Sequence, residues 1–103
     1  RFGRLDGCFA NAGVTGRGAK SFLDITAEEW RRVLSINLDG TFFTFKAALR
    51  HMVSRAETGD PGGRLVAVSS LASVSVPARN EHYAASKGAL NAMTFALAVE
   101  FDR

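Results

Sequence analysis

The sequence predicts an α/β fold with a parallel sheet, formed by a single domain that spans residues 1–103. Two short apolar segments, at 5–10 and 64–70, are bounded by turn residues and have the length of buried strands. Two longer segments, which begin near residues 26 and 81, repeat apolar residues at helical spacing. The order is therefore strand, helix, strand, helix, and such alternation implies parallel strands joined by right-handed crossovers.

The first half of the chain contains one strand and one long helical pattern. The strand is expected from Leu5 to Ala10, and it leads through Asn-Ala-Gly into a loop rich in glycine. The helix has a capping-box start, with Thr26 as N-cap and Glu29 three residues later. Its apolar pattern runs on to residue 53, but poor helix formers at 37, 39 and 40 interrupt it. We expect a break or a strained bend near Asn37.

The second half begins with a turn-rich surface loop at 54–63. The segment RLVAVSS that follows is a continuous apolar, β-branched run, which is typical of a parallel strand covered on both faces. After a further loop, a helix is expected from Glu81 to Phe101. Because the carboxyl ends of parallel strands meet at one edge, residues 11–13 and the serines at 69 and 70 face the same rim, where ligands gather.

Composition argues against several classes of function. The 13 basic and 10 acidic residues give a net charge of +3, and the basic ones are scattered, so no nucleic-acid partner is expected. No run of 18 or more apolar residues is present, so no membrane partner is expected. Cys8, His51 and His82 lack the spacing of metal ligands, and a single cysteine cannot form an internal disulfide. We therefore expect no metal and a reducing, cytoplasmic location.

The candidate chemistry lies at the start of the second helix, in the sequence HYAASKGAL. Tyr83 and Lys87 are one helical turn apart on one face, where the ammonium and the positive end of the helix dipole both favour the phenolate. A tyrosine placed in this way can transfer a proton near neutral pH. Ser70, which ends the second strand, can reach the same rim and hydrogen-bond a substrate oxygen. The alternative is a surface pair in which the lysine stem packs on the ring and its ammonium stays in water.

These motifs, taken in order, resemble those of the short-chain dehydrogenase/reductase family. ANAG at 10–13 is similar to the family's Asn-Asn-Ala-Gly segment after the fourth strand, although Ala10 replaces the first asparagine. SIN at 35–37 resembles the helix that bears a catalytic asparagine, and VAVSS with YAASK resembles the Ser-Tyr-Lys centre. The resemblance spans essentially the whole chain. It implies a partial Rossmann-like, doubly wound parallel sheet that is incomplete at both ends and runs from the fourth strand to the helix after the fifth.

The resemblance also implies a role for each matching residue. Tyr83 would be the general acid and base, Lys87 would favour its ionised form and bind the nicotinamide ribose, and Ser70 would orient and polarise the substrate oxygen. Asn37 would hold, through its main chain, a water that links Lys87 to solvent, whereas the residues alone favour a helix stop there. The residues expected to approach the cofactor, NAD or NADP, in addition to Tyr83 and Lys87, are Asn11, Ala12 and Gly13.

By this resemblance the chain is part of an oxidoreductase that transfers a hydride between a nicotinamide and a small-molecule carbonyl or alcohol substrate. The family's glycine-rich turn would precede residue 1 and its substrate-binding region would follow residue 103. We therefore expect this segment alone to be inactive, with a bare and sticky sheet. The full-length parent is expected to form a homo-oligomer, either a dimer or a tetramer. The alternative is a non-catalytic truncated fragment, or an oligomerisation module of the same fold, that acts through its apolar helices.

Overall fold

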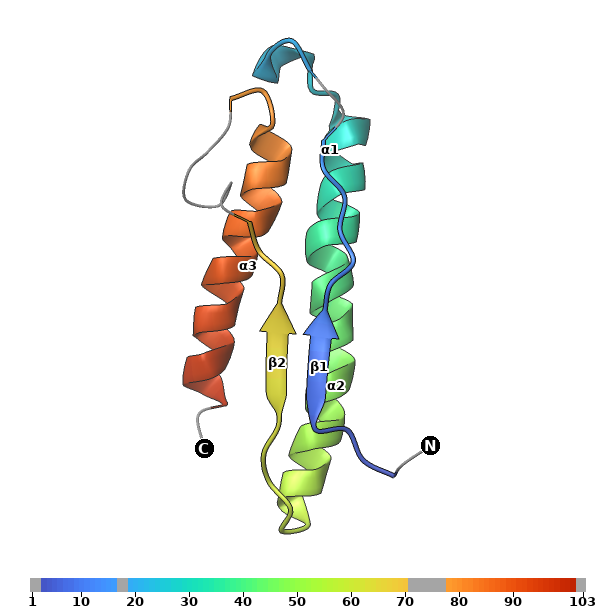
Figure 1. The fold of residues 1–103 in the computed structure, drawn as a ribbon, viewed down its shortest axis with the longest axis vertical. Helices are drawn as coiled ribbons and strands as arrows, with labels where there is room; N and C mark the ends of the chain where they lie inside the picture. The colour runs from blue at the N-terminus through green and yellow to red at the C-terminus, as the bar shows by residue number, and fades with distance from the viewer. Residues whose placement is uncertain (1–2, 17–18, 71–77, 102–103) are drawn as a thin grey trace.

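A parallel two-stranded sheet and three α-helices make up most of what the computed structural model describes, which is residues 3–16, 19–70 and 78–101. The strands are β1 (Gly7–Ala10) and β2 (Arg64–Ala67), and the helices are α1 (Ala27–Leu34), α2 (Gly40–Glu57) and α3 (Glu81–Glu100). The strands pair in parallel over their whole length, from Gly7 opposite Arg64 to Ala10 opposite Ala67. The predicted order of elements and the parallel sheet are confirmed (Figure 1).

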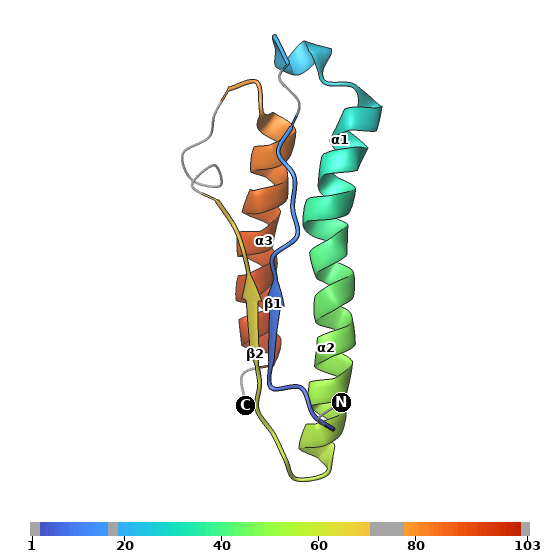
Figure 2. The ribbon, with the colours of Figure 1, turned by 45° about the vertical axis from the view of Figure 1, so that its right-hand side comes forward.

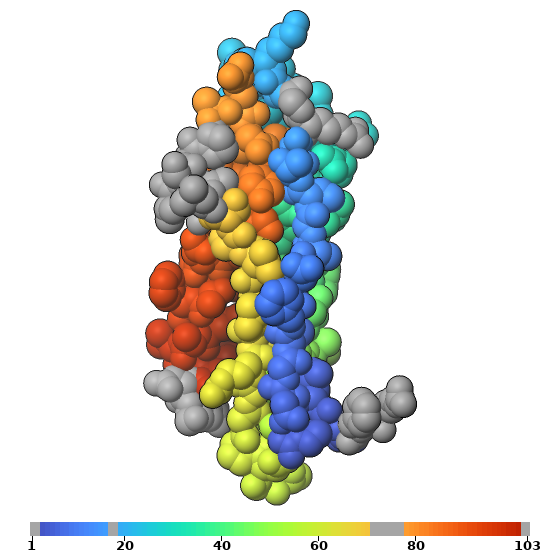
Figure 3. Space-filling view, viewed as in Figure 1, coloured from blue at the N-terminus to red at the C-terminus, as the bar shows by residue number. Residues whose placement is uncertain are grey.

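The helices lie on one side of the sheet only. Both α2 and α3 run antiparallel to the strands; α2 lies behind β1 in Figure 1, and α3 lies behind the strands in Figure 2. On the opposite face, the register-paired side chains of Phe9 and Val66 are 63% and 44% exposed, and Figure 3 shows both strands uncovered there. The apolar run of the second strand is typical of a strand covered on both faces, but in this chain one face is uncovered, and the expectation of a bare sheet face is confirmed. The resulting slab has a radius of gyration of 16.0 Å, against about 13 Å for a compact domain of 100 residues.

The element boundaries differ modestly from the predictions. β1 begins later and β2 ends earlier than expected, because ladder pairing is limited to four residues of each strand. The start of the first helix is confirmed: Thr26 is its N-cap, and the hydroxyl of Thr26 accepts a hydrogen bond from the Glu29 N–H at 3.0 Å. The predicted helix at the carboxyl end is confirmed from Glu81, and it ends at Glu100.

The interruption predicted near Asn37 is a π-helical turn, Ser35–Asp39 (η2), and the helix does not break there. The Gly40 N–H reaches back to the Ser35 carbonyl, and α1, η2 and α2 follow one another without a gap. Asn37 is 0% exposed, so its polar side chain faces the interior. The surface loop predicted at 54–63 is also shorter than expected, since α2 continues to Glu57.

The core is small, and its polar part is concentrated at one end. In the described part of the chain, the buried apolar residues are Val33, Phe45, Ala48, Met52, Ala84 and Leu90. The buried polar or charged residues are Asn37, Thr41, His82, Ser86 and Lys87. The polar set comes from η2, the start of α2 and the first half of α3, which surround the end of the sheet where the strands finish. Burying polar groups costs free energy, so a concentration of them in so small a core marks a candidate site.

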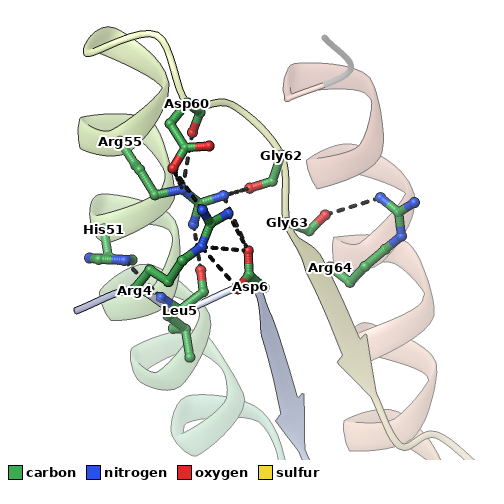
Figure 4. A network of polar contacts seen from close by, with 9 residues as sticks. All are labelled: Arg4, Leu5, Asp6, His51, Arg55, Asp60, Gly62, Gly63 and Arg64. Atoms are coloured by element: carbon green, nitrogen blue, oxygen red, sulfur yellow. Dashed lines mark hydrogen bonds and ion pairs between the residues drawn. The ribbon is translucent and has the colours of Figure 1, made fainter. Parts of the chain in front are cut away.

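The opposite end of the sheet is held by Arg55, near the end of α2 (Figure 4). Its guanidinium donates to the main-chain carbonyls of Leu5, Asp60 and Gly62, at 2.6, 3.0 and 2.7 Å. One planar donor group therefore joins the segment before β1 to the connection that leads into β2. This end of the molecule is built for stability, and its ionic groups lie away from the buried polar cluster.

Candidate active site

Tyr83 and Lys87 lie on the first two turns of α3, as the sequence predicted. The Lys87 Nζ is 5.8 Å from the centroid of the Tyr83 ring, and Lys87 is only 6% exposed. Its ammonium donates a hydrogen bond to the main-chain carbonyl of Val68 at 2.9 Å. The alternative of a surface pair with the ammonium in water is therefore wrong, because the charged end of Lys87 is the part that is held inside.

The residues that follow β2 are tied to α3 at the same lysine. Ser69 donates from its hydroxyl to the main-chain carbonyl of Lys87 at 3.1 Å, while the Lys87 ammonium donates to the carbonyl of Val68. These two bonds hold the chain just before Ser70 against the turn that carries Lys87. Ser70 itself is partly buried at this end of the sheet. The loop predicted after it falls mostly on residues 71–77, outside the described residues.

Asn37 connects the two halves of the site through its side chain. Its Oδ1 accepts from the Val14 N–H at 2.7 Å, and its Nδ2 donates to the Val14 carbonyl at 2.8 Å and to the Ser86 hydroxyl at 3.0 Å. The Ser86 hydroxyl in turn donates to the Tyr83 carbonyl at 2.7 Å. The interpretation of Asn37 as a helix stop is wrong, since the helix continues and the amide links the segment after β1 to the turn of α3 that bears Tyr83.

The main-chain carbonyl of Asn37 also has a partner. It accepts the hydroxyl of Thr41 at 3.1 Å, and Thr41 is 4% exposed. A carbonyl oxygen has two lone pairs, so it can accept a second hydrogen bond from a water molecule.

The segment of Asn11, Ala12 and Gly13 is exposed and follows β1 directly. A Cβ atom added at Gly13 would lie 3.1 Å from Asn37 Oδ1 and 3.2 Å from Lys87 Nζ. Gly13 therefore lies against both of these buried groups, and any larger residue would displace them. The structure thus brings Gly13, Asn37 and Lys87 together, while Asn11 and Ala12 stay open to solvent on the same rim.

Sequence reasoning missed the residues that support this arrangement from α3. Ser86 and His82 are both 0% exposed, and with Leu90 they recur every four residues along one face of the helix. That spacing is a helical core pattern, so it could have singled them out as buried polar residues. His82 contacts the carboxylate of Glu29, with 3.4 Å between Nε2 and Oε2, and this long-range pair has no signal in the local sequence.

Neither a membrane-spanning helix nor a metal-binding cluster is present within the described ranges. Every helix there is too short or too polar to cross a membrane. The same residues contain no group of three or more histidines, cysteines, aspartates or glutamates arranged to hold a metal ion.

The structure brings a phenol and an ammonium together, since the Tyr83 ring lies beside the buried Lys87 ammonium. Ser70 follows β2 and the exposed residues 11–13 follow β1, so both lie after the carboxyl ends of the strands. A positive charge held in a poorly solvated place stabilises negative charge on a nearby oxygen more strongly than it would in water. The geometry can therefore support exchange of a proton with an oxygen atom bound at this rim.

Comparison with known proteins gives a consistent picture. Residues 1–103 match the family model described as short chain dehydrogenase. An uncharacterized NAD-dependent oxidoreductase of Mycobacterium tuberculosis is 44% identical over 97% of this chain and 34% of its own length. The crystal structure of levodione reductase matches 100% of this chain and 38% of its own, with a TM-score of 0.90 and 34% identity. NAD⁺-bound xylitol dehydrogenase matches 96% of this chain and 36% of its own, with a TM-score of 0.86 and 36% identity.

These coverages show that the chain spans about a third of the length of the relatives it matches. The likeness to the solved structures also confirms the partial Rossmann-like architecture that the sequence motifs implied.

Proposed function

The chain belongs to the short-chain dehydrogenase family, and from that premise we propose that it supplies the proton-transfer centre of an NAD- or NADP-dependent oxidoreductase. The reaction is the interconversion of a small-molecule carbonyl compound and its alcohol. The observation that carries this proposal is the buried Lys87 ammonium beside the Tyr83 ring at the end of a parallel sheet. The relative from Mycobacterium tuberculosis is named as NAD-dependent, and xylitol dehydrogenase was solved with NAD⁺, which supports the cofactor class.

The rim fits a nicotinamide nucleotide. The small, exposed residues at 11–13 offer open main chain, and Gly13 leaves room where a side chain would meet Asn37 and Lys87. The Lys87 ammonium has three N–H groups, of which the Val68 carbonyl accepts one, so it can also donate to ribose hydroxyls. When bound, the nicotinamide accepts or supplies the hydride, which is chemistry that no amino-acid side chain provides.

In this proposal Tyr83 exchanges the proton with the substrate oxygen. During reduction the phenol gives its proton to the developing alkoxide, and during oxidation the phenolate takes the proton of the alcohol. Lys87 stabilises the negative charge that this leaves on the tyrosine oxygen, and the N-terminal position of Tyr83 in α3 acts in the same direction. Ser70 donates to the substrate oxygen and orients it, from its place just after β2.

Asn37 has two proposed tasks. Its side chain fixes the segment after β1 by pairing with Val14, and its main-chain carbonyl holds a water that relays protons between Lys87 and solvent. The Thr41 hydroxyl on the same carbonyl sets the direction that remains open for this water. The π-helical turn makes both tasks possible, because it directs the Asn37 side chain inward and interrupts the regular pattern of main-chain hydrogen bonds at that residue.

The test uses the full-length protein that contains this chain. Turnover is followed through nicotinamide absorbance, with NAD(H) and NADP(H), against a panel of secondary alcohols and the corresponding ketones. We expect activity that falls by about 100-fold or more in Tyr83→Phe, because general acid-base groups contribute on this scale. Glu100→Gln, at an exposed position at the far end of the same helix, is the control and should be as active as wild type. A Tyr83→Phe enzyme within a few-fold of wild type would refute the proposal.

We also propose that the residues outside this chain are needed for activity, since the chain spans about a third of its relatives' length. The isolated segment should bind NADH weakly and show no turnover. Saturable binding of NADH at micromolar concentration by residues 1–103 alone, measured by fluorescence titration, would contradict this.

A second candidate function is self-association through the outer faces of α2 and α3. These faces expose Phe43 at 65%, Phe95 at 75% and Val99 at 82%, and a groove of about 520 Å³ lies between the helices and the start of β2. Exposed apolar surface of this kind is typical of interfaces. Sizing with light scattering should show the full-length protein as a dimer or tetramer, and Phe95→Glu together with Val99→Glu should shift it toward monomer. A monodisperse monomer of the unmodified protein would exclude this function.

A further inference from the structure

His82 lies directly before Tyr83 and is 0% exposed. Its ring contacts Glu29, in the first turn of α1, with 3.4 Å between Nε2 and Oε2. The side chain of Glu29 is itself largely buried, at 15% exposure. This contact therefore joins the first turn of α1 to the first turn of α3, which is the turn that carries the proposed acid-base tyrosine.

The carboxylate decides which ring nitrogen carries the proton. A lone pair on Nε2 would face the Glu29 oxygen and repel it, so Nε2 is protonated and donates. The other nitrogen, Nδ1, is buried and has no hydrogen-bond partner among the described residues. An unpaired buried nitrogen destabilises the fold. Stability alone therefore favours an apolar residue at this position, and the histidine needs another explanation.

The ring also sets the path of the segment after β1. A Cβ atom at Gly16 would collide with His82 and with the Asn80 side chain, so only glycine fits there. The neighbouring Thr15 carbonyl accepts from Arg32 at 3.1 Å, and Arg32 pairs with Glu29 at 2.6 Å. The Glu29 carboxylate thus holds the imidazole on one side and, through Arg32, the loop on the other.

We propose that His82, held by Glu29, is a positioning residue. It fixes the position and orientation of the first turn of α3, and thereby the position of the Tyr83 phenol. The proposal rests on the proposed function of Tyr83. His82 touches neither substrate nor cofactor; it acts through the position of the residue that follows it. Asn37 and Ser86 hold the same turn at a second point, through the Tyr83 carbonyl. The turn that carries the tyrosine is therefore fixed twice, by a histidine–carboxylate contact and by an amide–hydroxyl chain.

The test compares His82→Leu and His82→Gln in the full-length protein. Leucine fills the space without a donor, whereas the glutamine amide places an N–H near the position of Nε2 and can donate to Glu29. We expect His82→Leu to lower kcat by about 10-fold, a part of the full acid-base effect, with KM and nucleotide affinity within two-fold of wild type and no loss in Tm. His82→Gln should recover most of the lost kcat. If His82 were needed only for folding, the leucine variant would lose Tm as well as kcat, so a lower kcat with unchanged Tm distinguishes the two roles.

Variants of Glu29 and a control variant of the other histidine test whether His82 acts through its contact with Glu29. Glu29→Ala should reproduce the loss of kcat, and the double variant with His82→Leu should be no slower than the worse single variant. His51→Gln is the matched control, because His51 accepts the Leu5 N–H at 3.0 Å at the far end of the sheet, and its kcat should not change. Wild-type kcat in His82→Leu, or equal losses in the leucine and glutamine variants, would overturn the role of His82. Full activity of Tyr83→Phe in the same series would instead overturn the proposed function and this inference with it.

Discussion

The side-chain amide of Asn37 pairs with both polar groups of the Val14 peptide. Oδ1 accepts the Val14 N–H at 2.7 Å, and Nδ2 donates to the Val14 carbonyl at 2.8 Å. Asn37 is fully buried, and the two residues belong to segments that lie on either side of the candidate site. The Asn37 side chain thus replaces the hydrogen bonds that a neighbouring strand would make, because it pairs with both the N–H and the carbonyl of Val14.

Replacing Asn37 should therefore damage both stability and activity. Asn37→Ala leaves two partly buried main-chain groups of Val14 without this partner and a cavity in their place, and we expect the free energy of unfolding to fall by about 1–3 kcal/mol. Asn37→Asp keeps the acceptor for the Val14 N–H but faces the Val14 carbonyl with a second oxygen, so it should also destabilise. Denaturant unfolding of the full-length protein measures both changes. Thr44→Ala is the control, since Thr44 is an exposed residue of α2 whose hydroxyl donates to the Gly40 carbonyl within its own helix. An alanine variant at 37 as stable as the control would show that the pairing is dispensable.

Gly13 should be required for cofactor binding more than for folding. In Gly13→Ala the new methyl group pushes against Asn37 Oδ1 and Lys87 Nζ, at 3.1 and 3.2 Å, and displaces the ammonium that is proposed to bind the nucleotide. We expect the dissociation constant for NADH to rise by about 10-fold or more, the scale of 1.4 kcal/mol. Gly7→Ala is matched to it, because its Cβ would lie 3.9 Å from the nearest atom. Equal affinities of the two variants in a fluorescence titration would argue against nucleotide contact at this rim.

The loss of folding stability at acid pH should depend in part on Asp6. A hydrogen bond from the Arg4 side chain holds the pKa of the Asp6 carboxyl below its ordinary value of 3.8, so the folded state prefers the ionised form. Because the folded pKa lies below the unfolded one, this contribution is complete above pH 3.8 and is lost as the pH falls through the folded value.

The measurement is denaturant unfolding of the full-length protein from neutral pH to below 3.8. Asp6→Asn should make the decline of stability with acid less steep. Asp24→Asn is the control, since Asp24 is exposed and forms no ion pair in the described part of the chain. A decline in Asp6→Asn as steep as in wild type would show that the pair with Arg4 does not act through ionisation.

Local signals in the sequence predicted the elements but not the contacts between them. The N-cap at Thr26, the apolar run of β2 and the helical pattern from Glu81 each depend on neighbouring residues, and each was confirmed. The poor helix formers near Asn37 indicated an irregularity in the helix. Whether the helix breaks there or forms a π-helical turn depends on the hydrogen-bond partners that the Asn37 side chain has in the interior.

The unpredicted part of the site is long-range. The partner of Asn37 lies before α1 in the chain and the partner of His82 lies within α1, so no local pattern pairs them. Their pairing follows only once the sheet and helices are assembled. The uncovered face at Phe9 and Val66 was expected, because two strands with their helices on one side leave the other face of the sheet bare.

The most direct test of the central claim, that Tyr83 and Lys87 act as one proton-handling unit, is a double-mutant cycle on the single-turnover rate. The rates of Tyr83→Phe, Lys87→Met and the double variant are measured in the full-length protein at saturating nucleotide. Groups that act as a unit give strongly non-additive losses, so we predict that the double variant is about as slow as the slower single variant. Losses that multiply would contradict the account, because they would mean that the ammonium and the phenol contribute independently.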